Sequence, residues 1–172
     1  PLNESVEDIE AAGELISKVR DNITYFHSSR YVSDLANGDI CVAAGYSGDI
    51  FQAAARAEEA GRDFTIGYSI PKEGAALWFD MMAIPADAPN PENAHAFINF
   101  ILDPEIAAEI SEYVRYANPN LAANEYLSDE LINDPAIYPE TDVMQNLYVQ
   151  VEKPQDILRA RTRTWNRVKS GR

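Results

Sequence analysis

Over the first 84 residues, helix-like and strand-like patterns of apolar positions alternate along the chain. Apolar positions at helical spacing predict a helix at 5–20, and further helices are predicted at 29–37 and from just after Asp49 to about Ala60. A nearly continuous apolar run predicts a strand at 40–44, and further strands are predicted at 23–26, 65–70 and 76–84. Ser5 with Asp8 resembles a capping box, and Gly38 and Gly61 follow predicted helix ends. This alternation predicts an α/β lobe with a largely parallel sheet.

The pattern changes at Pro85, after which the chain is helical or irregular. Helices are predicted at 93–102, 104–115 and 154–168, with short helical turns at 129–132 and 142–147. Pro104 stands at a favoured first-turn position. The last predicted helix gathers cations towards its C-terminal end, where they suit the helix dipole: Arg159, Arg161, Arg163, Arg167 and Lys169.

Two of the apolar runs end with an aromatic ring beside a carboxylate. The first carries Tyr46 and Asp49, and the second carries Trp78 and Asp80. A ring face attracts positive charge and covers methylenes, while a carboxylate pairs with an ammonium. If both runs reach one cleft, the expected ligand is a small diamine or polyamine.

Each acid also has a structural explanation. Asp49 can cap the helix that follows it, an interpretation about as well supported as a ligand role. Asp80 shares a strand face with Trp78 and is costly to bury unpaired, so it either faces a cleft or pairs with an arginine of this protein. Tyr116, in a polar loop after a helix, is a weaker site candidate.

Composition removes several classes of function. Twenty-eight acidic and fourteen basic residues in 172 give a net charge of −14, which argues against nucleic acid and against an anionic membrane surface. No apolar stretch approaches the ~20 residues that span a bilayer, so no membrane insertion is expected. The chain begins with Pro1 and not with Met, which predicts a processed or truncated product.

Cys41 is the only cysteine and lies inside a predicted strand. A buried free thiol is the expected state. The alternative, for an exported protein, is a disulfide partner in a missing part of the same polypeptide.

Enzyme and metal motifs are weak. Residues 45–49 depart from the G-x-S-x-G pattern because Asp49 replaces the second glycine, and only His27 and His95 could serve as bases. A serine hydrolase using Ser47 is therefore disfavoured, and Asp49 would repel a phosphate in the same turn. No cysteine pair, paired-histidine motif or EF-hand loop is present, so no metal or cofactor is expected.

The chain resembles the C-terminal half of the periplasmic polyamine-binding proteins of bacterial ABC transporters. The resemblance rests on residues 23–29 (ITYFHSS), 35–43 (LANGDICVA), 69–75 (SIPKEGA), 116–118 (YAN) and 161–165 (RTRTW). It implies an α/β, type II-like periplasmic binding fold, here the C-terminal portion of a two-lobed hinge protein. Residues 1–78 would form a second-lobe segment, and 79–172 a hinge-crossing strand followed by helices that pack on lobe one and return across the lobes.

The resemblance also implies a function. The protein would be a non-enzymatic periplasmic receptor that delivers a polyamine to an ABC permease, and its N-terminal half, with a cysteine that pairs with Cys41, would be missing here. Tyr46, Trp78 and Tyr116 would line the cleft, while Asp49 and Asp80 would bind ammonium groups. Tyr46 replaces a usual tryptophan and Trp78 a frequent phenylalanine, and the larger Trp78 slightly favours spermidine over putrescine. A sensory or interaction module using the same cleft is the alternative.

Overall fold

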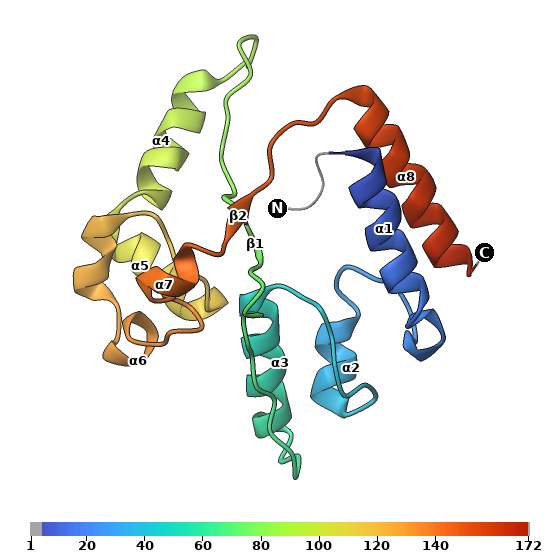
Figure 1. Cartoon of the computed structure of the whole chain (residues 1–172). Coiled ribbons are helices and arrows are strands. Elements are labelled where there is room, and N and C mark those ends of the chain that lie inside the picture. The colour runs from blue at the N-terminus through green and yellow to red at the C-terminus, as the bar shows by residue number, and fades with distance from the viewer. Residues whose placement is uncertain (1–4, 172) are drawn as a thin grey trace. The chain divides into compact units, whose positions relative to one another are not determined.

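The computed structural model describes residues 5–171, and its secondary structure is mainly helical (Figure 1). The chain forms two compact units, one made of Pro1–His27 with Tyr148–Arg172 and the other of Ser28–Leu147. The first unit contains α1 (Val6–Ser17), η1 (Arg20–Asn22), β2 (Tyr148–Val149) and α8 (Gln155–Ser170). The second contains α2 (Tyr31–Asn37), α3 (Ser47–Glu59), β1 (Ala76–Leu77), α4 (Pro91–Ile101), α5 (Pro104–Val114), η2 (Leu121–Tyr126), α6 (Asp129–Ile132) and α7 (Thr141–Met144).

In the first unit, the first and last helices of the chain, α1 and α8, pack side by side (Figure 1). Ile9 of α1 is buried with Ile157 and Ala160 of α8. The Arg20 Nε and Nη2 atoms donate to the Val168 and Lys169 carbonyls at 3.1 and 3.2 Å. Two carbonyl groups in the last turn of α8 therefore accept hydrogen bonds from one guanidinium.

The second unit has two separate buried clusters. One lies between α2 and α3 and contains Tyr31, Leu35, Ala36, Ile50 and Ala53. The other lies between α5 and η2 and contains Ala107, Ala108 and Ala123. The small side chains of the second cluster let the two helical segments approach closely.

The helix predictions are confirmed to within a few residues, because local capping residues determine where helices begin and end. The Ser5 side chain accepts from the Asp8 N–H at the start of α1. Gly38 ends α2 in the left-handed conformation, with φ of 80°. The Asp103 side chain accepts from the N–H groups of Glu105 and Ile106 at the start of α5.

The strand predictions are wrong over most of their length. Between residues 5 and 171, the predicted strands at 23–26, 40–44 and 65–70 are irregular, and the one predicted at 76–84 is reduced to β1. A strand needs hydrogen bonds from a neighbouring strand, and apolar composition cannot supply that neighbour.

The Cys41 segment illustrates the difference. Ile40 and Ala43 pack against the α2–α3 cluster, but Val42 is 87% exposed and Cys41 is also exposed. The expectation of a buried thiol in a strand covered on both faces is therefore wrong. One side of the segment meets the core and the other faces outward.

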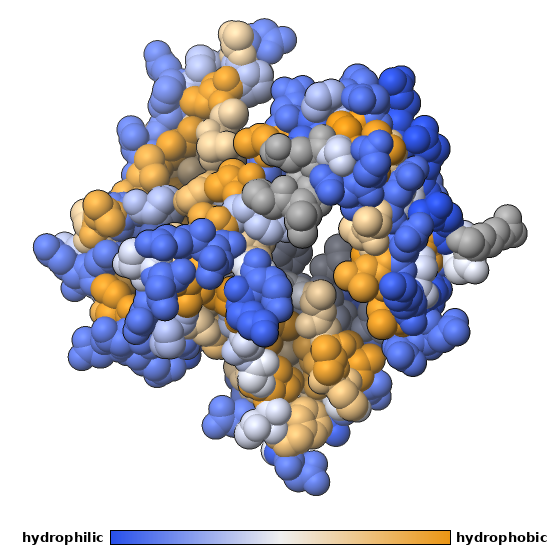
Figure 2. Space-filling view, viewed as in Figure 1, coloured by the Kyte–Doolittle hydropathy of each residue, from blue (hydrophilic) through white to orange (hydrophobic). Residues whose placement is uncertain are grey.

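Helix α4 has an uncovered apolar surface. Phe97 and Phe100 are each 57% exposed, and no described residue of α4 is buried. Figure 2 shows hydrophobic surface along this helix. Side chains of this size are normally covered in a folded protein.

Candidate functional site

Asp49 lies in the first turn of α3, shortly after Tyr46, the residue that precedes the helix. The helix begins with Tyr46 as its N-cap residue, and no side chain caps it there. The capping role considered for Asp49 is therefore wrong. Its carboxylate is committed to other partners.

Both carboxylate oxygens of Asp49 receive tyrosine hydroxyl groups. The Tyr31 hydroxyl, from α2, donates to Oδ2 at 2.6 Å, and the Tyr116 hydroxyl donates to Oδ1 at 3.3 Å. The Tyr31 oxygen also accepts from the backbone N–H of Tyr46 at 3.1 Å. One buried hydroxyl thus links the loop backbone at Tyr46 to the carboxylate at Asp49.

Three rings are arranged in a row beside this carboxylate. The rings of Tyr46 and Trp78 meet edge to face, with centroids 4.9 Å apart and an interplanar angle of 65°. Trp78 meets Tyr116 in the same manner at 6.1 Å and 78°. Because Tyr46 and Trp78 are 47% and 42% exposed, their free surfaces can still contact a ligand.

Two glycines allow the close approach that builds this cluster. A Cβ on Gly45 would lie 2.5 Å from Cε2 of Tyr31, and a Cβ on Gly48 would overlap the ring of Tyr116. Arg115 directs Tyr116 towards α3 by ending α5 in the left-handed conformation, with φ of 58°. That conformation is uncommon for a residue with a side chain, and an ion pair with Glu130 at 2.9 Å accompanies it.

The environment keeps both hydroxyl groups protonated. Burial, with the hydrogen bond to Asp49 second, raises the pKa of Tyr31 from 10.0 to about 12. Burial, with the charge of Asp49 second, raises the pKa of Tyr116 well above its usual value. At neutral pH both groups therefore serve as hydrogen-bond donors to the carboxylate.

Asp80 does not join this cluster. Within residues 5–171, no hydrogen bond or ion pair links it to another side chain, and it is exposed. An arginine partner was expected only because burying the Asp80 carboxylate unpaired would be costly. Since the residue is exposed, that cost does not arise. Four of the five predicted site residues lie together: Tyr46, Asp49, Trp78 and Tyr116. The fifth, Asp80, follows Trp78 by two residues in an irregular segment.

Sequence reasoning missed Tyr31. It occupies an apolar position of a predicted helix, and its hydroxyl partner lies eighteen residues further along the chain. No local spacing rule connects a helix position to a loop carboxylate at that separation.

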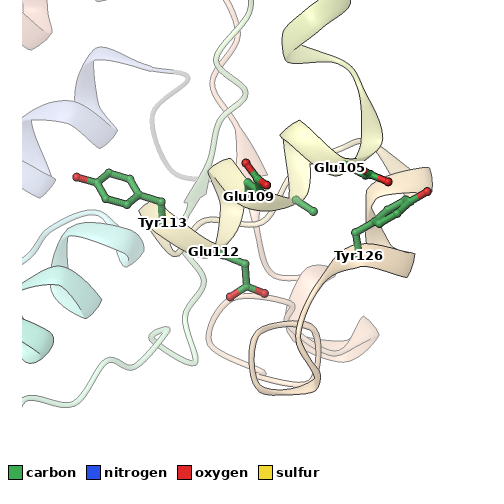
Figure 3. Close-up of a pocket in the computed structure, with 6 residues that line it drawn as sticks. Glu105, Glu109, Glu112, Tyr113 and Tyr126 are labelled. Atoms are coloured by element: carbon green, nitrogen blue, oxygen red, sulfur yellow. The ribbon is translucent and has the colours of Figure 1, made fainter.

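An open hollow of about 540 Å³ lies elsewhere, between α5 and η2. It is lined by Glu105, Ala108, Glu109, Glu112, Tyr113 and Tyr126. Figure 3 shows the two tyrosines pointing away from one another, and Tyr113 is 86% exposed. The hollow shares no residue with the ring-and-carboxylate cluster, and nothing in it converges on a common centre.

Among the described residues, no group of three or more histidine, cysteine or acidic side chains is placed to hold a metal ion. In the same part of the chain, no helix combines the length and the apolar character needed to cross a membrane.

The comparisons with known sequences all point to bacterial solute-binding proteins. The family model described as bacterial extracellular solute-binding protein matches residues 2–139. The putrescine-binding periplasmic protein SpuD of Pseudomonas aeruginosa is 53% identical over all 172 residues. The putrescine-binding periplasmic protein PotF of Escherichia coli is 50% identical over 94% of the chain. The spermidine/putrescine-binding periplasmic protein of Escherichia coli is 35% identical over 81%.

The fold has a solved counterpart. The spermidine/putrescine ABC transporter substrate-binding protein PotD from Streptococcus pneumoniae superposes with a TM-score of 0.78 at 28% identity and covers 99% of the chain. The chain spans about half the length of the proteins it matches, 47% of SpuD and 51% of the PotD structure. The predicted type II periplasmic binding fold is confirmed by this likeness.

Proposed function

Because the chain belongs to the family of bacterial extracellular solute-binding proteins, we propose that it is the C-terminal half of a periplasmic polyamine receptor. The observation that carries the proposal is the cluster of three rings around the Asp49 carboxylate. Three relatives described above, which are named as putrescine-binding and spermidine/putrescine-binding proteins, support the same ligand class. The protein is a receptor and not an enzyme.

The chemistry of the cluster suits an organic dication. Asp49 neutralises one ammonium, and the exposed faces of Tyr46 and Trp78 cover the methylenes next to it. A desolvated cation–π contact contributes on the order of 2 kcal/mol, so rings and carboxylate together can reach micromolar affinity. Asp80, exposed beyond Trp78, binds the second ammonium of an extended ligand.

The missing wall of the site would come from the N-terminal half of the receptor. Two features support this partner: the chain spans about half of its relatives, and α4 leaves two phenylalanines uncovered. We assign residues 1–78 to the second lobe and 79–172 to a hinge crossing and returning helices, with residues 1–4 and 172 outside the described part. Exposed Cys41 is then available for a disulfide with that half.

The whole receptor would deliver its ligand to an ABC permease from the periplasm. Between polyamines, the size of the Trp78 ring favours spermidine, whereas the relatives SpuD and PotF carry putrescine in their names. The preference for spermidine remains a prediction that direct comparison of the two affinities decides.

The test is calorimetric titration of the chain, alone and mixed with the N-terminal half of SpuD, using putrescine, spermidine and butane-1,4-diol. The diol has the length of putrescine without its charges. The proposal is supported if a polyamine binds saturably in at least one of the two preparations and the diol binds in neither. Asp49→Asn should then weaken the polyamine binding at least tenfold. No polyamine binding in both preparations, or equal binding of the diol, contradicts it.

A further inference from the structure

Tyr31 is not one of the residues proposed to contact the ligand, which are Tyr46, Asp49, Trp78 and Asp80. Its side chain comes from α2, the residue is only 4% exposed, and its ring packs within the α2–α3 cluster. A ligand resting on the exposed rings of Tyr46 and Trp78 has no direct access to a residue so deeply buried. Any effect of Tyr31 on binding must therefore pass through other residues.

The Tyr31 hydroxyl uses both of its hydrogen-bonding functions within the site. It donates to Oδ2 of Asp49 at 2.6 Å and accepts from the N–H of Tyr46 at 3.1 Å. The donated bond is short because its acceptor is charged. The accepted bond fixes the backbone of the residue that carries the first ring.

The two oxygens of Asp49 are held unequally. Oδ2 is held by a short bond from a buried residue, whereas Oδ1 receives the Tyr116 hydroxyl at 3.3 Å, near the limit of a hydrogen bond. The weaker contact is the one that an incoming ammonium can share or replace. The stronger one keeps the carboxylate in a single orientation while this happens.

We propose that Tyr31 is a positioning residue, whose hydroxyl orients Asp49 and the Tyr46 backbone so that Oδ1 faces the ammonium of the ligand. This inference rests on the proposed polyamine function. The ring of Tyr31 is needed for packing against Gly45, but the hydroxyl is needed for binding. Preorganised acceptors increase affinity because less order must be imposed when the ligand arrives.

The first test is a double-mutant cycle on putrescine affinity with Tyr31→Phe and Asp49→Ala. Tyr31→Phe keeps the buried ring and is expected to weaken binding about tenfold, the effect of losing one hydrogen bond to a charged group. In the Asp49→Ala background the same change is expected to have no further effect, because the group that it orients is absent. Tyr113→Phe, at an 86% exposed tyrosine, is the matched control and should stay within about twofold.

A second measurement needs no change at Tyr31 and no ligand. In proton NMR the buried Tyr31 hydroxyl should give a slowly exchanging signal that Asp49→Ala abolishes. Unchanged affinity in Tyr31→Phe, an equal loss in both backgrounds, or a hydroxyl signal indifferent to Asp49→Ala would overturn the inference. If the wild-type chain binds no polyamine either alone or mixed with the N-terminal half of SpuD, the receptor function is overturned instead, while the NMR signal still decides whether Tyr31 holds Asp49.

Discussion

Gly48 lies so close to Tyr116 that a Cβ at this position would overlap the tyrosine ring. The same Cβ would lie 2.5 Å from the backbone carbonyl oxygen of Val114, which cannot rotate away. The missing side chain at Gly48 therefore lets the end of α5 approach the start of α3. This approach brings the Tyr116 hydroxyl to Asp49.

Gly48→Ala is expected to destabilise the fold by about 1–3 kcal/mol, because an inserted methyl group forces backbone movement. It should also weaken polyamine binding, since Tyr116 is displaced from Asp49. Urea unfolding followed by circular dichroism measures the first effect and calorimetry the second. Gly67→Ala is the control, because a Cβ there meets no atom within 4 Å. A variant as stable as the Gly67→Ala protein would contradict the packing argument.

Asp80→Asn is expected to weaken binding of putrescine at least tenfold without changing the thermal unfolding midpoint. The carboxylate is exposed and has no ion pair within residues 5–171, so its charge is available to a ligand and contributes little to folding. Asp87→Asn, at another exposed acid, is the control. A large loss of stability in Asp80→Asn would instead indicate an internal structural role.

Trp78→Phe is expected to lower the affinity for spermidine more than that for putrescine, because a smaller ring covers fewer methylenes. The measured quantity is the ratio of the two dissociation constants. Trp165→Phe provides a matched control, since that tryptophan is also 42% exposed but packs on Phe26 in the other unit. A wild-type protein that binds putrescine more tightly than spermidine would refute the predicted preference.

Alkaline pH should destabilise the protein through Tyr31. Folding raises the pKa of this residue from 10.0 to about 12, so the folded state keeps a proton that the unfolded chain releases. The resulting stabilisation is complete below pH 10 and is lost as pH rises towards 12. Urea unfolding across this window should show a decline in the free energy of unfolding that is smaller in Tyr31→Phe. Identical declines in the two proteins would contradict the assignment.

Most helices could be predicted from the sequence, because their determinants are local. Capping by Ser5, the left-handed glycine at Gly38 and the Asp103–Pro104 start of α5 each act within one turn. Four of the five predicted site residues lie together in the structure, and their role in binding stays a prediction. The strands were mispredicted because a strand depends on a partner that no local pattern encodes.

The sequence by itself determined the helices, the net negative charge and the presence of aromatic rings close to carboxylates. All three depend on residue type and near neighbours. Only the tertiary structure decided which of these side chains meet. It joined Asp49 to Tyr31 and Tyr116, placed Trp78 between two tyrosines, and left Asp80 and Cys41 exposed. The physical reason is that hydrogen bonds and ring contacts form between residues 18 to 67 positions apart, where close packing and not sequence spacing determines distance.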